Sequence, residues 1–168
     1  MSETYTTMPS PVGDLLLTGE DGRLTGLYLP SDRYARHAAA NPGSARRNDA
    51  AFAAVRRQLE EYFAGERGSF DLPVAPAGTP FQQGVWAELQ RIGYGTTITY
   101  AELAARIGRP TAIRAAGAAN GANPVSIVIP CHRVIAADGT LGGFGGGLTV
   151  KQTLLDLESG SDRTLPLR

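Results

Sequence analysis

The chain has 168 residues, which is long enough to bury a real hydrophobic core in one domain or in two small ones. Its 42% hydrophobic and 19% charged residues suit an ordinary soluble globular protein. Lys and Arg total 16, and so do Asp and Glu, which excludes a global positive field that would attract nucleic acid. Any DNA binding must therefore come from a local patch or an inserted element.

The sequence shows no signal for a membrane or for secretion. No apolar run approaches the roughly 20 residues of a membrane helix, and residues 1–5 are not a basic segment followed by an apolar stretch. The single cysteine cannot form an internal disulfide, which fits a reducing compartment. We therefore expect a soluble cytoplasmic protein.

The first half, residues 1–75, predicts a small α+β scaffold. Residues 32–48, which include His37, are expected to form a surface excursion. The segment from residue 49 onward has apolar residues at helical spacing, whereas the other apolar runs are short and bounded by turns. The predicted elements are strands at residues 5–8, 15–18, 24–29 and 70–74 and a helix from Asp49 to Gly65.

After a linker at residues 75–78, the pattern becomes mainly helical over residues 79–160. Capping boxes at Thr79 and Thr99 predict two helix starts. The predicted helices span residues 79–92, 99–107 and 111–122. The last two are joined by a tight Gly-Arg-Pro turn, which makes them a helix-turn-helix candidate.

The third of these helices is mostly alanine and glycine, and Arg114 is its only charged residue. A helix that reads the major groove usually presents several Arg, Asn or Gln side chains. A smooth face with one guanidinium suits a shallow groove, where Arg114 could occupy the space left by an extruded base. The alternative is a helix packed tightly on the core, with Arg114 in a surface salt bridge.

An apolar run at residues 125–129 predicts a buried strand that ends at Pro130, directly before Cys131 and His132. A thiol held beside a possible base is what nucleophilic catalysis requires. The alternative is that Cys131 is a small buried hydrophobe. A glycine-rich stretch follows at residues 142–147. It is either a loop whose backbone can approach a ligand closely or simply a flexible loop. A third capping box at Thr149 predicts a last helix, which places Glu158 in its final turn and hints at a partner for this acid; residues 161–168 form a tail.

The string Pro-Cys-His-Arg-Val, preceded by Asn123-Pro124, resembles the active-site signature of the O6-alkylguanine-DNA alkyltransferase family. The resemblance is nearly continuous from Thr79 to Glu158 and looser in the first half. It implies an α/β fold with an RNase-H-like N-terminal domain and a mainly helical C-terminal domain that binds DNA through the minor groove. It also implies single-use transfer of the alkyl group from O6-alkylguanine, and from O4-alkylthymine, to the cysteine of a monomeric protein.

The resemblance assigns roles to individual residues. Cys131 would accept the alkyl group and His132, oriented by Glu158, would deprotonate it through a water. Tyr100 would donate a proton to the flipped base, and Asn123 would brace the recognition helix against the active-site strand. Further DNA or substrate contacts are expected at Arg114, Thr111, Ala112, Ala115, Gly117, Val134, Phe144, Gly145, Gly146 and Lys151.

No cofactor is implied, and no zinc is expected in the first half, which offers only His37 and no cysteine. Two rival functions remain open. A non-catalytic alkyltransferase-like protein would recognise DNA lesions without repair, although such relatives lack the cysteine. A Cys-His hydrolase would use Cys131 for a transient acyl-enzyme, but then the alanine-rich helix would have no purpose.

Phe144 departs from the tyrosine expected at this family position. A phenylalanine keeps the pocket wall but lacks a hydroxyl that would help to hold O6, a hydrogen bond worth about 0.5–1.5 kcal/mol. We therefore expect Phe144→Tyr to transfer the alkyl group faster than the parent in single-turnover assays. A variant no faster than the parent would contradict this expectation.

Overall fold

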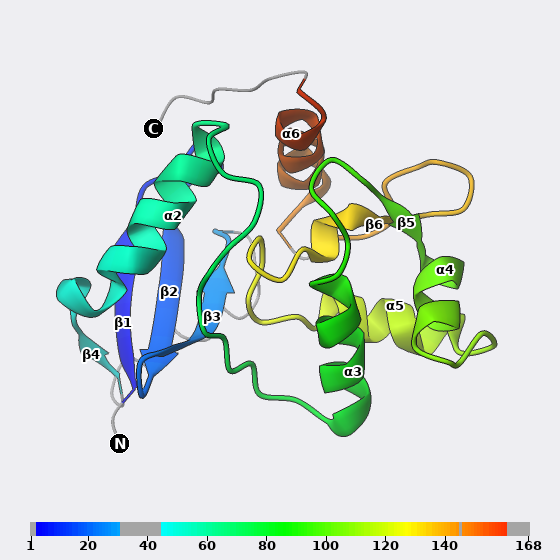
Figure 1. Cartoon of the computed structure of the whole chain (residues 1–168), viewed down its shortest axis with the longest axis horizontal. Helices are drawn as coiled ribbons and strands as arrows, with labels where there is room; N and C mark the ends of the chain where they lie inside the picture. The colour runs from blue at the N-terminus through cyan, green and yellow to red at the C-terminus, as the bar shows by residue number, and fades with distance from the viewer. Residues whose placement is uncertain (1–2, 31–44, 145, 161–168) are drawn as a thin grey trace.

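The N-terminal half forms a small sheet covered on one face by a helix (Figure 1). The computed structural model describes residues 3–30, 45–144 and 146–160. The strands are β1 (Thr4–Met8), β2 (Leu15–Glu20), β3 (Arg23–Tyr28) and β4 (Arg46–Arg47), in the order β3-β2-β1-β4. Asp21 and Gly22, with φ of 54° and 76°, make the tight turn between β2 and β3 that the sequence predicted.

The helix over this sheet begins with a short 3-10 turn, η1 (Asp49–Phe52), and continues as α2 (Ala53–Phe63). Its predicted apolar stripe is buried, which confirms the helical spacing. Strand β4 was not predicted, because two exposed arginines show no apolar alternation. His37 lies outside the described residues, so its predicted exposure stays a prediction.

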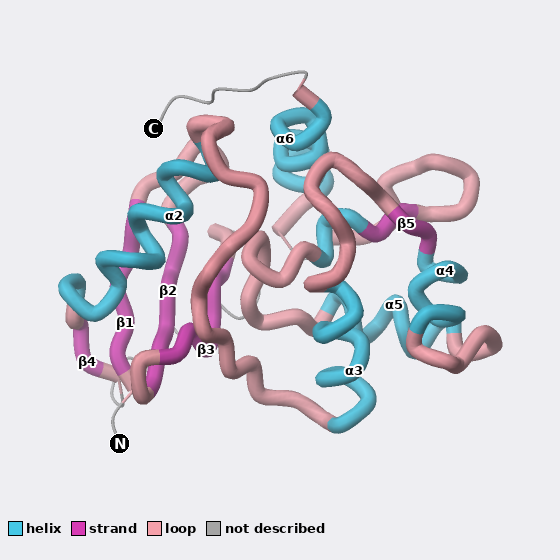
Figure 2. Tube along the Cα trace, in the orientation of Figure 1, coloured by secondary structure: helices cyan, strands magenta, loops and turns pink. Residues whose placement is uncertain are grey.

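The C-terminal half is mainly helical, and Figure 2 shows how little of it is strand. Its elements are α3 (Pro80–Leu89), β5 (Ile98–Thr99), α4 (Tyr100–Arg106), α5 (Ile113–Gly121), η2 (Cys131–Arg133), β6 (Val134–Ile135) and α6 (Leu148–Ser159). Both capping boxes, at Thr79 and Thr99, are formed as predicted. The box predicted at Thr149 is wrong: α6 begins at Leu148 after Gly147, whose φ of 98° favours glycine, and no side chain caps it.

The strand predicted at residues 125–129 is also wrong, and a compact buried turn takes its place. The amide of Ile129 donates to the carbonyl of Val125 at 3.0 Å, and Ile127 adopts a φ of 71°. This conformation is strained for a β-branched residue, and the buried side chain of Asn123 helps to impose the turn. It accepts from the Val125 amide at 2.9 Å and donates to the Ile129 carbonyl at 2.8 Å. The predicted strand at residues 70–74 is reduced to a single bridge between Val74 and Leu24.

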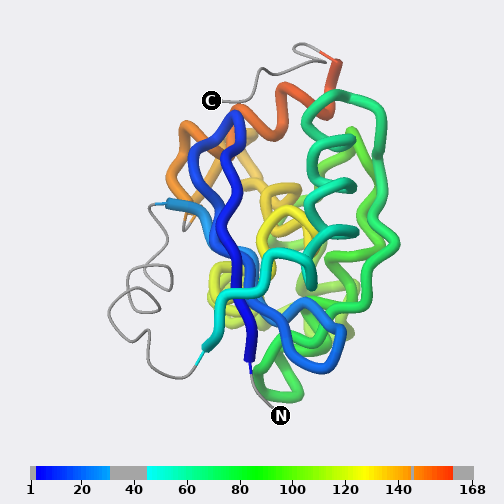
Figure 3. The backbone as a smooth tube through the Cα atoms, turned by 90° about the vertical axis from the view of Figure 1, so that its left-hand side faces the viewer, coloured from blue at the N-terminus to red at the C-terminus, as the bar shows by residue number. Residues whose placement is uncertain are grey.

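The outer edge of β3 joins the two halves. The Leu27 amide donates to the Pro124 carbonyl at 2.8 Å, and the Ser126 amide donates to the Leu27 carbonyl at 3.2 Å. Figure 3 shows the segment near residue 125, in yellow, behind the blue strands. One hydrophobic core runs through both halves, so the sheet supports the turn that precedes Cys131. In the described part of the chain, no helix is long and apolar enough to cross a membrane.

Removing the Asn123 side chain should destabilise the protein strongly. Asn123→Ala leaves the buried Val125 amide without its acceptor, so we expect a loss of about 2–3 kcal/mol in the free energy of unfolding, measured with urea. Gln83→Ala is the matched control, because its exposed amide donates to the Pro76 carbonyl at 2.6 Å. It should cost less than about 0.5 kcal/mol. Equal losses in the two variants would contradict this account of the turn.

Candidate active site

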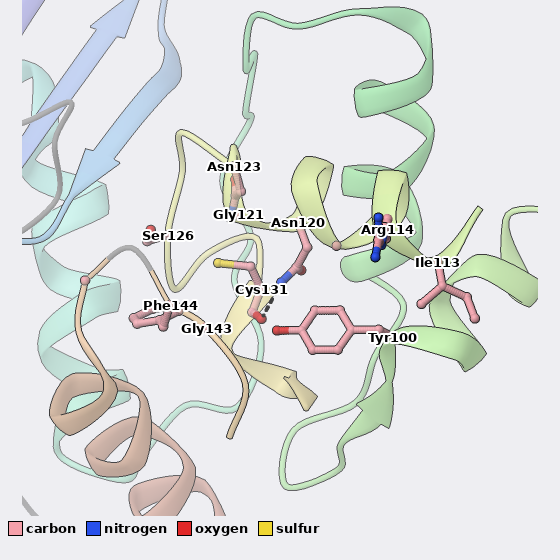
Figure 4. A pocket seen from close by; sticks show the side chains of 12 residues that line it. Tyr100, Ile113, Arg114, Asn120, Gly121, Asn123, Ser126, Cys131, Gly143 and Phe144 are labelled. Atoms are coloured by element: carbon pink, nitrogen blue, oxygen red, sulfur yellow. Dashed lines mark hydrogen bonds between the residues drawn. The ribbon is translucent and has the colours of Figure 1, made fainter. Parts of the chain in front are cut away.

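A cavity of about 440 Å³ opens between α5, the 3-10 turn η2 and the glycine-rich segment (Figure 4). Predicted site residues, Cys131 among them, and unpredicted ones meet in its wall. The lining residues are Tyr100, Ile113, Arg114, Gly117, Asn120, Gly121, Asn123, Ser126, Cys131, Gly143, Phe144 and Gly146. The space is of the size that small-molecule sites use.

Cys131 lines the cavity, but the residue is only 5% exposed, so it is largely shielded from solvent. Burial raises the pKa of this thiol, while hydrogen bonds from Asn123 and Ser126 and the charge of Lys151 act in the opposite direction. The thiolate is the reactive form of cysteine. The resting site therefore holds a protonated thiol, which needs a base before it can react.

His132 is fully buried and is not among the residues that line the cavity. Its Nε2 lies 2.7 Å from Oε2 of Glu158, as the predicted His-Glu pairing requires. Burial lowers the pKa of His132 and outweighs the opposing effect of Glu158, so the ring is neutral near pH 7. An ionised carboxylate can only accept, so Nε2 carries the proton and Nδ1 has a free lone pair. Nδ1 has no hydrogen-bond partner among the described residues.

Glu158 accepts hydrogen bonds from three side chains in a buried network. Besides His132, Tyr62 donates its hydroxyl to Oε2 at 2.5 Å, and Arg133 donates from Nε to Oε1 at 2.8 Å and from Nη2 to Oε2 at 3.1 Å. Burial alone would raise the pKa of Glu158, but the hydrogen bonds and charges of His132 and Arg133 hold it at about 2. The acid placed unfavourably at the end of α6 thus has the partners that the sequence hinted at.

Lys151 was predicted to contact DNA or substrate, which stays a prediction, and the structure gives it a further role. The side chain is fully buried and its ammonium donates to three backbone carbonyls, those of Val134, Leu141 and Gly143. On α6 it shares the buried face with Leu154 and Glu158. Lys151 therefore holds the segment after Cys131 against α6. Val134 is also buried, and its carbonyl already accepts from Lys151.

Tyr100, at the start of α4, closes one side of the cavity. Burial raises the pKa of its phenol, the nearby Cys131 adds to this, and a hydrogen bond with the Gly143 backbone opposes it. A Cβ atom at Gly142 would come within 2.9 Å of the Tyr100 oxygen, and one at Gly117 within 3.5 Å of its ring. Gly142 therefore leaves room for this tyrosine, whereas a Cβ at Gly117 would make only an ordinary van der Waals contact with it.

The remaining predicted DNA contacts lie on or beside the outer face of α5. Arg114, Thr111 and Ala115 are exposed, and Ala112 is half-buried. Arg114 borders the cavity mouth and forms no ion pair with any residue that the structure describes. Beside it, Ile113 is 42% exposed, which is unusual for an isoleucine in a folded protein. Gly145 lies outside the described residues.

Comparisons with known proteins fit this geometry. The family described as 6-O-methylguanine DNA methyltransferase, ribonuclease-like domain, matches residues 4–76, and its DNA binding domain matches residues 80–160. The methylated-DNA–protein-cysteine methyltransferases of Methanosarcina acetivorans and Mycolicibacterium paratuberculosis are 46% and 49% identical to this chain. They cover 92% of this chain, which spans 97% and 91% of their lengths. The chain belongs to the 6-O-methylguanine DNA methyltransferase family.

A solved member of this family is also similar in structure. Mycobacterium tuberculosis OGT in complex with DNA superposes with a TM-score of 0.86 at 43% identity, over 94% of this chain and 93% of that one. The predicted fold class is therefore confirmed: a ribonuclease-like α/β half and a mainly helical DNA-binding half.

Among the site residues that the sequence analysis did not single out, four have polar side chains. Arg133 belongs to the recognised motif and could have been found there as a partner for Glu158. Tyr62 fell in an apolar helical stripe and was predicted only as core. Asn120, whose amide donates to the Cys131 carbonyl at 3.3 Å, lies in the predicted helix 111–122, and Ser126 lies in the predicted strand 125–129, but neither was singled out as a site residue. In the described ranges, no three His, Cys, Asp or Glu side chains are grouped to hold a metal ion.

The depressed pKa of Glu158 predicts an acid-dependent loss of stability. An unfolded glutamate titrates near 4.5 and the folded Glu158 near 2. Its contribution of about 3 kcal/mol is therefore complete above pH 4.5 and disappears as pH falls towards 2. Urea unfolding between these pH values should show this loss in the parent and in Glu60→Gln, an exposed control on α2. Glu158→Gln should not show this part of the loss. If its free energy of unfolding depended on pH as that of the parent does, the proposed network would be contradicted.

Proposed function

We propose that this protein repairs DNA by taking the alkyl group of O6-alkylguanine, and of O4-alkylthymine, directly onto Cys131. The family is that of the methylated-DNA–protein-cysteine methyltransferases. The observation that carries the proposal is a cavity lined by the single cysteine, whose neighbour in the chain is a buried histidine held by a carboxylate. This arrangement suits a cysteine nucleophile that attacks a group inserted into the cavity.

The proposed chemistry is a single displacement. His132 takes the proton of the Cys131 thiol through a water at Nδ1, and the thiolate attacks the alkyl carbon. An S–C bond forms as the C–O6 bond breaks, and the electron pair of that bond stays on guanine. Tyr100 gives this leaving base a proton, and its phenolate regains one from the imidazolium. The resulting thioether has no good route back to a thiol, so each molecule acts once.

The raised pKa of Tyr100 supports this role, since a phenol that keeps its proton at neutral pH can donate it. Phe144 and Gly146 would form the wall around the base, with the Gly145 amide facing O6. The Cys131 and Val134 carbonyls would accept from the guanine amino group through their second lone pairs, since they already accept from Asn120 and Lys151. Asn123 would brace the turn before Cys131 against α5.

We further propose that α5 enters the minor groove with its small-residue face and that Arg114 fills the stack when the base flips out. Supporting observations are the exposure of Arg114 at the cavity mouth and the exposed alanine and threonine positions around it. The similar M. tuberculosis structure is a complex with DNA. We propose that the protein acts as a monomer in the cytoplasm, without a cofactor, and that residues 1–75 support residues 79–160, which carry the chemistry.

Intact-protein mass spectrometry tests the proposal. After incubation with a duplex that carries one O6-methylguanine, the chain should gain one methyl group and then stop, whereas Cys131→Ala should gain none. An unmodified protein that still binds the duplex would instead indicate a non-catalytic lesion-binding protein. No gain and no binding would overturn the proposal and favour the hydrolase alternative.

Arg114 should matter only when a base must leave a duplex. Because extrusion costs a few kcal/mol, Arg114→Ala should slow transfer from a methylated duplex about tenfold or more. Transfer from the free O6-methylguanine base should keep its rate. Arg57→Ala on α2 removes the same charge from an exposed position of the other half and is the control. Equal slowing with duplex and free base would show that Arg114 does not act as a finger.

A further inference from the structure

The active-site network includes a residue from the other half of the chain. Tyr62 lies on α2, which packs on the N-terminal sheet, and its hydroxyl donates to Oε2 of Glu158 at 2.5 Å, across 96 positions of sequence. The same oxygen accepts from Nε2 of His132 at 2.7 Å. The phenol and the imidazole therefore share one acceptor atom, and both side chains are fully buried.

We propose that Tyr62 is a positioning residue for the alkyl transfer: its hydroxyl fixes the Glu158 oxygen that in turn orients His132. The inference rests on the proposed function, because it concerns the base that activates Cys131. It makes the N-terminal half a contributor to the reaction as well as a support. A residue that fixes the orientation of a catalytic base commonly affects activity strongly, although it does not touch the substrate itself.

The surroundings hold Tyr62 in one place. Its ring packs against Phe63, Phe70 and Tyr94, with ring centroids 5.3, 5.4 and 6.3 Å away. A phenol so enclosed can pivot little, and an O–H donor to a carboxylate makes a strong, charge-assisted hydrogen bond. The hydroxyl can therefore set both the direction of the carboxylate and the share of its negative charge that reaches His132.

Besides burial, three charged groups affect the pKa of His132. Arg133, on the same 3-10 turn, and Lys151, on α6, both lower the pKa of His132, and Glu158 raises it. Tyr94 lies under the Arg133 guanidinium, 5.8 Å from the ring centroid. Removing the Tyr62 hydroxyl leaves these groups in place and frees Oε2 of one donor. More of the carboxylate charge then stabilises the imidazolium, so the pKa of His132 should rise.

The experiment compares full-length Tyr62→Phe with the parent by NMR titration of the histidine rings. The chain has only two histidines, so the His132 signal is readily assigned with a His37→Gln variant. We expect the pKa of His132 to rise by about half a unit or more. The low-pH limb of the transfer rate should move by the same amount, making transfer about twofold slower at the pH of the parent's half-maximal rate.

Tyr94→Phe is the matched control. Its hydroxyl donates to the Leu157 carbonyl at 3.4 Å, next to Glu158 in the chain. This variant should leave the His132 titration unchanged. An unchanged His132 titration in Tyr62→Phe, with only a lower melting temperature, would overturn the proposal and make the tyrosine purely structural. The titration needs no alkyl transfer, so failure of the proposed function would appear separately, as a parent protein that gains no methyl group.

Discussion

One buried carboxylate, that of Glu158, determines how the active site is built. A charge removed from water is costly unless its oxygens are fully hydrogen-bonded. Glu158 meets this condition with three donor side chains from two elements: Tyr62 of α2, and His132 and Arg133 of the 3-10 turn after Pro130. The network therefore joins the N-terminal half, the cysteine segment and the last helix at one point. The same hydrogen bonds that keep the charge buried fix the tautomer of His132.

The positions of Cys131 and His132 follow from a second constraint, the buried turn that precedes them. Neighbouring side chains on a strand point to opposite faces. In a 3-10 turn, with about three residues per turn, neighbouring side chains also point in different directions. Cys131 can thus face the cavity while His132 faces Glu158. The strained Ile127 is held in place because Asn123 and the edge of β3 bind the backbone on both sides of it.

The sequence predicted the helices of this protein better than the structure around its cysteine. Helix periods and capping boxes are local, so α2, α3 and α4 could be found from neighbouring residues. The run at residues 125–129 has the composition of a strand, but a long-range bridge to Leu27 and the Asn123 amide impose a turn on it. The capping box at Thr149 failed because Gly147, with its left-handed backbone, starts the helix earlier.

The site itself was predicted through a motif, and the motif names residues without their surroundings. Cys131 lines the cavity and His132 pairs with Glu158, as the resemblance implied. The resemblance implied that Lys151 contacts DNA or substrate, and it could not show that backbone carbonyls satisfy the lysine ammonium inside the protein. Tyr62 could not be predicted, because its contact spans both halves and depends on how they pack.

The account depends most directly on an ionised, fully hydrogen-bonded Glu158. Carbon-13 NMR of the labelled side-chain carboxyl groups, followed from pH 6 downward, would measure its titration in the folded protein. The structure predicts a pKa of about 2 for Glu158. A carboxyl that titrates near the ordinary value of 4.5, while the protein remains folded, would show that the network does not hold the charge. It would also remove the reason for assigning the free lone pair of His132 to Nδ1.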